Sequence, residues 1–306
     1  MKAVIAKGYG GPEVLSVEQA AKPKPKSNEI LIKVIAASLN SGDVRMRALD
    51  AGGGVKGFVS KIIIRLLVGI KKPKRIQGSV LAGEVVEVGD EVTRYKVGDE
   101  VYAMTGFSFG AFAEYCALPD KRAIALKPKK ASFEEASAIP FGGNTALYFL
   151  RKAGVNKNKN VLIYGSTGAV GTSAVQIANY LGAEVTAVSG PDGMDLTKKL
   201  GASKVYNYKK TRLEDIKGSF DVVFDAVGKI SKSAASHLIA EEGKYITVDS
   251  LDVAKESSSD LEELADMFDN GILVATIDKT FDIDDIVKAN RYVDSGRKKG
   301  SVVITI

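Results

Sequence analysis

Residues Val161 to Thr172 read Val-Leu-Ile-Tyr-Gly-Ser-Thr-Gly-Ala-Val-Gly-Thr, and this stretch decides the fold. Its apolar, β-branched start, Val161 to Tyr164, predicts a buried strand, and a helical pattern follows the glycines as far as Leu181. A second strand pattern, Glu184 to Val188, comes at the distance that a βαβ unit needs. The stretch therefore predicts a strand, a tight turn and the start of a helix in a parallel α/β sheet.

Each glycine of this turn suits a dinucleotide site. Gly165 allows the tight turn, Gly168 lets the backbone approach a pyrophosphate, and Gly171 lets the helix pack close to the strand. Unpaired N–H groups at the positive end of the helix dipole would hold the phosphates. The predicted cofactor contacts are Gly165, Ser166, Thr167, Gly168, Ala169, Val170 and Gly171.

Composition and charge indicate a soluble globular protein. A chain of 306 residues is long for one hydrophobic core, so two domains are expected, and 45% apolar with 26% charged residues is typical of the globular class. The net charge of +6 comes from one segment, Lys56 to Arg75, which holds seven lysines and arginines and no acid. The rest of the chain is close to neutral, so the charge predicts no nucleic-acid partner.

Cysteine usage and the start of the chain favour the cytoplasm. Cys116 is the only cysteine, which excludes an internal disulfide and favours a reducing compartment. Met1 to Ile5 begins directly with a strand pattern and shows no apolar leader. The longest apolar run, Phe58 to Ile70, contains Lys61 and Arg65 and is too short to span a bilayer.

The pattern of elements changes along the chain. Residues 1–124 read mainly as strands and turns, helix and strand patterns alternate over 125–271, and 272–306 adds strand, helix and strand. Alternating strands and helices predict a mostly parallel, doubly wound α/β sheet. We therefore predict a β-rich domain over 1–124, a dinucleotide-binding domain over 125–271, and a return to the first domain over 272–306.

Three helices are predicted at specific places. Ser132 and Glu135 form a capping box that begins a short helix. A second helical pattern runs from Asn144 to Lys152, and a third from Ser231 to Ile239.

Six motifs follow one another along almost the full chain. They are Asn40-Ser41-Gly42-Asp43, Gly110 to Tyr115, Pro140 to Leu147, Gly165 to Gly171, Phe224-Asp225-Ala226-Val227-Gly228 and Ser295 to Gly300. Together they resemble the zinc-independent medium-chain dehydrogenase/reductases, and among these the quinone oxidoreductases. The resemblance implies a GroES-like catalytic domain with an inserted Rossmann domain. It also implies that NADPH reduces a quinone or an α,β-unsaturated carbonyl compound.

The resemblance also implies roles for individual residues. In this family the residues matching Asn40 and Asp43 line the cleft, and the residue matching Thr145 lies near the nicotinamide. These three are the candidates for catalytic positioning, and Val227 joins the cofactor contacts. The alternative for each candidate is a structural role, in a turn for Asn40 and Asp43 and in a helix for Thr145.

The choice between NADPH and NADH depends on the end of the second Rossmann strand. An NAD site would place an acid there for the ribose hydroxyls, but this chain has Ser189. Ser189 and Tyr208 match family positions that hold the 2′-phosphate, whereas the family's basic residue between them is missing and Asp192 occupies that region. NADPH is therefore expected and NADH less favoured. The alternative is that Ser189 only ends a strand and Tyr208 only packs.

No metal is expected. A catalytic zinc needs three protein ligands from cysteine, histidine or carboxylate side chains, and this chain has one cysteine, Cys116, and one histidine, His237, far apart. Cys116 is interpreted as a buried small hydrophobe and His237 as a surface or cap residue.

Two departures from the family stand out. Val80 occupies a position where the family usually has a polar or acidic residue. After the strand Lys244 to Val248, only Asp249 to Asp260 precede the next helix. That is too short for the helix and sixth edge strand through which the family dimerises. We therefore expect a sheet shortened at its C-terminal edge, with the dimer absent or built differently.

The segment 57–75 combines apolar residues at helical spacing with basic residues: Phe58, Ile62, Leu66 and Ile70. It is interpreted as a helix over the cleft entrance or a subunit contact. The alternative is contact with an anionic membrane surface. The rival function to an oxidoreductase, suggested by Val80 and the lost edge segment, is a non-catalytic NADP(H)-binding redox sensor or a membrane-associated binding protein.

Overall fold

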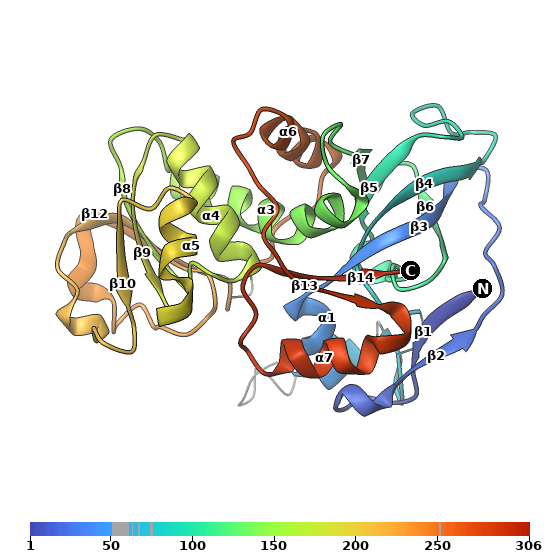
Figure 1. Cartoon of the computed structure of the whole chain (residues 1–306), viewed down its shortest axis with the longest axis horizontal. Helices are drawn as coiled ribbons and strands as arrows, with labels where there is room; N and C mark the ends of the chain where they lie inside the picture. The colour runs from blue at the N-terminus through green and yellow to red at the C-terminus, as the bar shows by residue number, and fades with distance from the viewer. Residues whose placement is uncertain (51–60, 63, 67, 74–75, 251) are drawn as a thin grey trace. The chain divides into compact units, whose positions relative to one another are not determined.

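The computed structural model describes the chain except for residues 51–60, 63, 67, 74–75 and 251. The chain divides into two compact units (Figure 1). The first unit contains Met1–Pro140, Glu256–Ala265 and Ile277–Ile306, and the second contains Phe141–Lys255 and Asp266–Thr276. The first unit is therefore built from both ends of the chain.

The first unit is organised around a seven-stranded sheet in the order β13-β14-β3-β4-β5-β7, with β6 also paired to β3. Its strands are β3 (Glu29–Leu39), β4 (Val80–Val88), β5 (Glu100–Met104), β6 (Tyr115–Pro119), β7 (Ala123–Leu126), β13 (Ile277–Asp282) and β14 (Ser301–Thr305). Neighbouring strands are antiparallel except β13 and β14, which are parallel. A separate antiparallel pair consists of β1 (Lys2–Ala6) and β2 (Leu15–Gln19). The β-rich module predicted for the start of the chain is confirmed.

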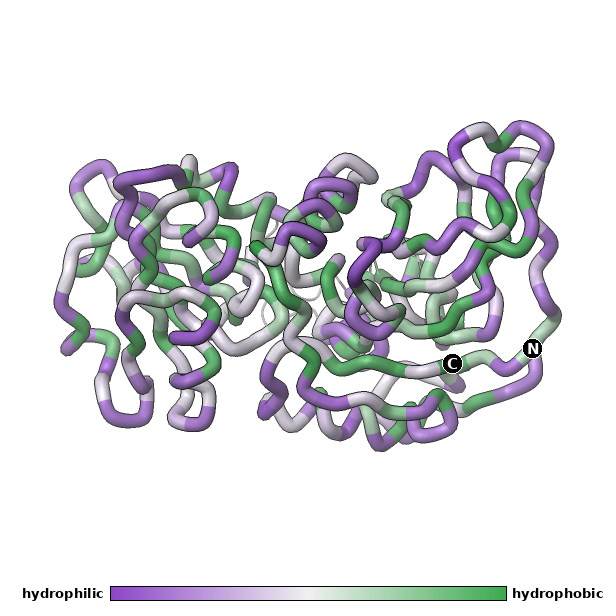
Figure 2. Tube along the Cα trace, turned by 45° about the horizontal axis from the view of Figure 1, so that its top comes forward, coloured by the Kyte–Doolittle hydropathy of each residue, from purple (hydrophilic) through white to green (hydrophobic). Residues whose placement is uncertain are grey.

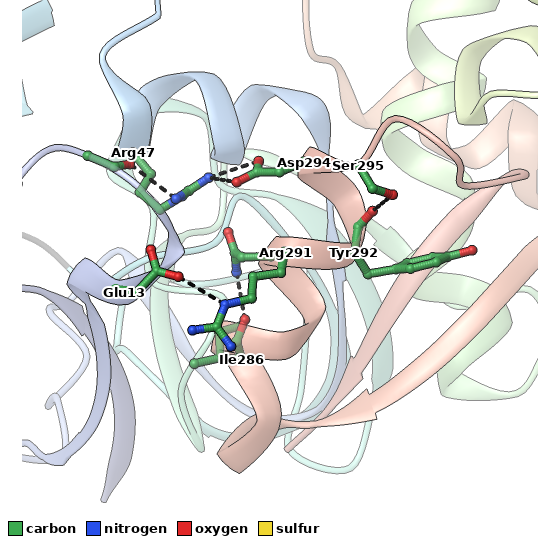
Figure 3. A network of polar contacts seen from close by, with 9 residues as sticks. Glu13, Arg47, Ile286, Arg291, Tyr292, Asp294 and Ser295 are labelled. Carbon is green, nitrogen blue, oxygen red and sulfur yellow. Dashed lines mark hydrogen bonds and ion pairs between the residues drawn. The ribbon is translucent and has the colours of Figure 1, made fainter.

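The C-terminal helix α7 (Ile286–Asp294) is tied to α1 (Ser41–Ala48) by an ion pair (Figure 3). Arg47 Nη2 donates to both carboxylate oxygens of Asp294, at 2.9 and 2.7 Å, and Nη1 donates to the Gly10 carbonyl. The Arg47 side chain is only 2% exposed. A second pair on the same helix, Arg291 with Glu13, is exposed. This partly buried pair therefore joins residue 47 to residue 294, far apart in the sequence.

The second unit contains a five-stranded parallel sheet in the order β10-β9-β8-β11-β12. Its strands are β8 (Asn160–Tyr164), β9 (Glu184–Ser189), β10 (Lys204–Asn207), β11 (Phe220–Asp225) and β12 (Ile239–Thr247). Helices α4 (Ala169–Tyr180) and α5 (Met194–Lys199) pack against β8, β9 and β10 (Figure 1). The strand order reverses direction between β8 and β11, and such a point is where open α/β sheets bind ligands. The predicted parallel, doubly wound sheet is confirmed.

Hydropathy follows this architecture. Hydrophobic residues run along the strands inside each unit, and many turns are hydrophilic (Figure 2). In the second unit, Leu162, Val188 and Val223 are at most 1% exposed and belong to one core cluster. No helix in the described part of the chain has the length and apolar character needed to cross a membrane.

The parallel sheet ends at β12. Between β12 and helix α6 (Ser258–Asp269), the described residues form no further strand. The shortened C-terminal edge expected from the sequence is therefore confirmed, while the oligomeric state inferred from it stays a prediction.

Two helix predictions were wrong. The capping box is present, with the Ser132 N–H donating to Glu135 Oε2 at 2.9 Å and the Glu135 N–H to Ser132 Oγ at 3.1 Å. However, one helix, α3 (Phe133–Ala153), continues through Pro140 where two separate helices were expected. The fixed backbone angle of proline is itself helical, so Pro140 removes one hydrogen bond without ending the helix.

The helix predicted from Ser231 to Ile239 is reduced to one short 3-10 turn, Ser236–Leu238. The Ser231 hydroxyl accepts the Ala234 N–H at 3.1 Å, and the Ser236 hydroxyl donates to the Ser233 carbonyl at 2.8 Å. Serine side chains that bond to nearby backbone groups compete with helix formation, which explains the difference.

Part of the segment 57–75 lies outside the described residues, including Phe58. Among its described members, the apolar residues Ile62, Leu66 and Ile70 are exposed, whereas Val68 is buried. The Tyr9 hydroxyl donates to the Gly69 carbonyl at 2.7 Å, which ties this part of the segment to a residue near the N-terminus. Contact of this segment with a membrane or another subunit stays a prediction.

Candidate dinucleotide-binding site

The turn after β8 is held by its neighbours in the sheet. The backbone N–H groups of Gly165 and Ser166 both donate to the Val188 carbonyl on β9, at 3.0 and 3.1 Å. Gly165 has a φ of +81°, and a Cβ added there would lie 2.5 Å from the Val227 side chain, which follows β11. The turn therefore requires glycine at this position, and it lies where the strand order reverses.

The other two glycines have different surroundings. A Cβ at Gly171 would lie 2.2 Å from the Gly165 carbonyl oxygen and 2.7 Å from Ser166 Cα, so α4 packs directly on the turn. A Cβ at Gly168 would meet nothing closer than 3.8 Å. Gly168 is the N-cap of α4, and no side chain caps this helix. Space and uncapped helix N–H groups therefore occur together at Gly168, which fits the close approach of a diphosphate.

Buried hydroxyl groups form hydrogen bonds that connect the turn to β9 and α5. Ser166 Oγ lies 3.1 Å from Thr197 Oγ1 and 3.2 Å from the Val188 carbonyl oxygen, and the Thr197 hydroxyl donates to the Gly193 carbonyl at 2.9 Å. Gly193 in turn leaves room for Thr167, whose Cγ2 would lie 2.2 Å from a Cβ there. Thr197 could not be recognised from the sequence, because a threonine in a helical pattern gives no sign of a partner in another segment.

The structure brings Ser189 and Tyr208 together. The Tyr208 N–H donates to the Ser189 carbonyl at 3.1 Å, and a Cβ on Gly190 would lie 3.3 Å from the Tyr208 hydroxyl oxygen. Ser189 is buried and its hydroxyl donates to the Gly190 carbonyl at 3.0 Å, whereas Tyr208 is 50% exposed. Asp192 lies exposed in the 3-10 turn η3 (Pro191–Gly193) that follows. Of the two predicted phosphate ligands, Tyr208 is the exposed residue and Ser189 the buried one.

Thr145 lies within α3, in the second unit. Its hydroxyl donates to the Phe141 carbonyl one turn earlier, at 2.7 Å, so the helix alternative for this residue is what the structure displays. The adjacent Asn144 is buried, donates from Nδ2 to the Lys255 carbonyl at 3.0 Å, and has an Oδ1 without a partner among the described residues. The role of Thr145 near a nicotinamide stays a prediction.

Asn40 and Asp43 lie in the first unit and cap α1. The Asn40 N–H donates to Asp43 Oδ2 at 2.9 Å, and the Ser79 hydroxyl donates to Asp43 Oδ1 at 2.8 Å. Both residues are buried, as is Val80. Burial raises the pKa of Asp43 to about 6, against the lowering effect of the hydrogen bonds from Asn40 and Ser79. Both residues thus have a structural role at the start of α1, which was the alternative given for them. A role in lining the cleft stays a prediction.

The Asp43 carboxyl makes stability depend on pH. Its folded pKa of about 6 exceeds the ordinary 3.8, so the folded state holds the additional proton between these values. The free energy of unfolding should therefore fall as pH rises from 4 to 6, by up to about 3 kcal/mol from this group. Urea unfolding of the wild type and Asp43→Asn at pH 4 to 7 should show this loss in the wild type only. Parallel curves for the two proteins would contradict it.

Three family models match the chain. The alcohol dehydrogenase GroES-like domain covers residues 26–129, and the zinc-binding dehydrogenase domain covers 169–275, with a second model of that description over 249–304. In the described part of the chain, no three histidine, cysteine, aspartate or glutamate residues lie together as metal ligands. Cys116 is buried in the core with its pKa raised to about 12 by burial, as expected of a small hydrophobe, and His237 is exposed. The residues present therefore do not fit the zinc site that the description names.

Known proteins resemble the chain over its full length. The 2-methylene-furan-3-one reductase of Solanum lycopersicum is 34% identical over 99% of this chain and 79% of the relative. The chloroplastic NADPH-dependent alkenal/one oxidoreductase of Arabidopsis thaliana is 30% identical with the same coverage. The solved structure of the quinone oxidoreductase from Coxiella burnetii matches with a TM-score of 0.85 and 27% identity, covering 100% of this chain and 99% of that one. The chain therefore belongs to the medium-chain dehydrogenase/reductases, within the quinone oxidoreductase family.

Proposed function

We propose that this protein is a zinc-independent, NADPH-dependent reductase of α,β-unsaturated carbonyl compounds or quinones. The observation that carries the proposal is the turn at Gly165 to Gly171, where an uncapped helix N-terminus and open space at Gly168 occur together. Relatives at 34% and 30% identity are reductases of such compounds by name, which supports the same chemistry here.

Different residues of the second unit would hold different parts of the cofactor. The N–H groups that begin α4 would bind the diphosphate, since they point from the positive end of the helix dipole. Val227 closes one side of the turn through its contact with Gly165, and Tyr208 would donate its hydroxyl to the 2′-phosphate. When bound, NADPH supplies a hydride to the electron-poor carbon of the substrate, and a proton from solvent completes the reduction.

The protein's own contribution to catalysis is then mainly to position the cofactor and the substrate. Without a metal ligand set among the described residues, holding the two reactants in line is the part of catalysis left to the fold. Asn40, Asp43 and Thr145 are proposed as positioning residues through the ordered backbone that they cap or continue. The cytoplasm remains the expected location.

Turnover tests the proposal. The purified full chain should oxidise NADPH in the presence of members of a panel of enals, enones and quinones, followed by the absorbance of the reduced nicotinamide. Binding can be followed by the fluorescence of NADPH itself, because the reduced nicotinamide is excited at wavelengths that protein side chains do not absorb. Tight NADPH binding without turnover on any compound would favour the redox sensor instead. Absence of binding would overturn both functions.

A further inference from the structure

The 2′-phosphate end of the proposed site, at Ser189 and Tyr208, has no positive charge among the residues named so far. A phosphate monoester carries close to two negative charges at neutral pH. The Ser189 hydroxyl is committed to the Gly190 carbonyl, and the exposed residue of the following turn is acidic, Asp192. Tyr208 supplies a hydroxyl but no charge. Another cation is needed if this end of the site is to prefer NADPH.

Two lysines directly follow Tyr208 at the carboxyl end of β10. The Lys209 N–H donates to Asn207 Oδ1 at 2.9 Å, and the Lys210 N–H donates to the Asn207 carbonyl at 2.9 Å. Asn207 is 7% exposed and forms the last position of β10, paired with Ser189 of β9. The turn made by the Asn207 side chain therefore holds the backbone of both lysines beside the Ser189 and Tyr208 end of the sheet.

The two ammonium groups are available to a ligand. Both side chains are exposed, and within the described residues neither Lys209 nor Lys210 forms an ion pair. Nearby Arg212 differs in this respect, because it pairs with Glu214. Two positive charges without an ion-pair partner thus lie at the carboxyl end of β10, where the adenosine ribose of a dinucleotide would lie. An exposed cation attracts a phosphate most strongly at low salt.

We propose that Lys209 and Lys210 supply the positive charge for the 2′-phosphate of NADPH and so determine its preference over NADH. This role rests on the proposed function, in which the 2′-phosphate lies beside Tyr208. Asp192 opposes them, so the preference is the balance of two lysines against one carboxylate. The hydroxyl of Tyr208 lies between these groups in the chain and orients the phosphate.

The test compares two paired substitutions in the full-length enzyme. Lys209→Gln with Lys210→Gln should lower kcat/KM for NADPH about 10-fold through KM, and leave the value for NADH within about 2-fold. The matched control is Lys198→Gln with Lys199→Gln. These consecutive exposed lysines end α5, which leads into the amino end of β10, whereas Lys209 and Lys210 follow its carboxyl end. In that control, kcat/KM should stay unchanged for both NADPH and NADH. Added salt should raise KM for NADPH in the wild type and have a weaker effect in the Lys209 and Lys210 variant.

Each outcome decides the proposal. An equal loss for NADPH and NADH would show a structural role and overturn it, and so would an unchanged KM for NADPH or a wild type without NADPH preference. Asp192→Asn, which removes the opposing charge, should raise the NADPH preference. If no substrate is turned over, the proposed function fails by itself. The affinities of NADPH and NADH, measured by fluorescence, then still test the lysines.

Discussion

Gly171→Ala is expected to abolish NADPH binding at accessible concentrations. The added Cβ would lie 2.2 Å from the Gly165 carbonyl oxygen and 2.7 Å from Ser166 Cα, and neither backbone atom can rotate away. Either α4 moves off the turn or the turn opens, at a cost of about 3 kcal/mol or more in the stability of the second unit. Because the N–H groups that begin α4 would then no longer meet the diphosphate, we expect a loss of about 100-fold or more in NADPH affinity. Fluorescence titration and thermal unfolding measure the two effects.

Gly168→Ala is the matched control, and it separates cofactor contact from folding. The nearest atom to its new Cβ is 3.8 Å away, and its φ of −74° suits any residue. Stability should therefore stay within about 0.5 kcal/mol of the wild type. NADPH affinity should still fall about 10-fold, because the methyl group occupies space that the diphosphate needs. Normal NADPH binding by Gly168→Ala would show that the diphosphate lies elsewhere.

Asp294→Ala is expected to destabilise the first unit by about 3–5 kcal/mol. The substitution leaves the Arg47 guanidinium, 2% exposed, without its carboxylate and with only the Gly10 carbonyl as a described acceptor. Its Nε already lacks a partner among the described residues. A buried uncompensated charge is more costly than the loss of the pair itself. Arg47→Met should therefore cost less than Asp294→Ala, since Asp294 is 32% exposed and can be hydrated. Urea unfolding of both variants measures the difference.

Arg291→Ala provides the control on the same helix. Its ion pair with Glu13 joins side chains that are 58% and 62% exposed, so it should contribute less than about 1 kcal/mol (Figure 3). A loss from Arg291→Ala as large as that from Asp294→Ala would mean that both substitutions act by disrupting α7 as a whole. The buried ion pair would then not be the cause.

The turn and the parallel sheet could be predicted because their signals are local. Glycine spacing between Gly165 and Gly171 and the apolar runs around it involve neighbouring residues, and the structure has the strand, turn and helix in that order. The shortened sheet edge followed from counting residues between Val248 and the next helix. The proximity of Ser189 and Tyr208 came from the family resemblance, and the pairing of β9 with β10 shows it.

The missed features depend on contacts between distant segments. The bond between Ser166 and Thr197 joins residues 31 positions apart, and the bond between Asp43 and Ser79 joins residues 36 apart. Neither pair leaves a periodic pattern in the sequence. The helix α3 also continues through Pro140, although proline usually ends a helix, so the two separate helices predicted on either side of it were wrong.

The register of β14 has a consequence for how the protein is made. Val302 and Val303 of β14 pair with Leu39 and Ser38 of β3, in the interior of the antiparallel sheet. During synthesis from the N-terminus, residues 36–39 of β3 therefore stay without their β14 partner until β14 has been translated, whereas β4 and β6 can pair with β3 much earlier. The inserted parallel sheet emerges complete before β14 arrives, so it is positioned to mature first. The delay leaves the end of β3 that pairs with β14, residues 36–39, open to chaperones and to mispairing until β14 has been made.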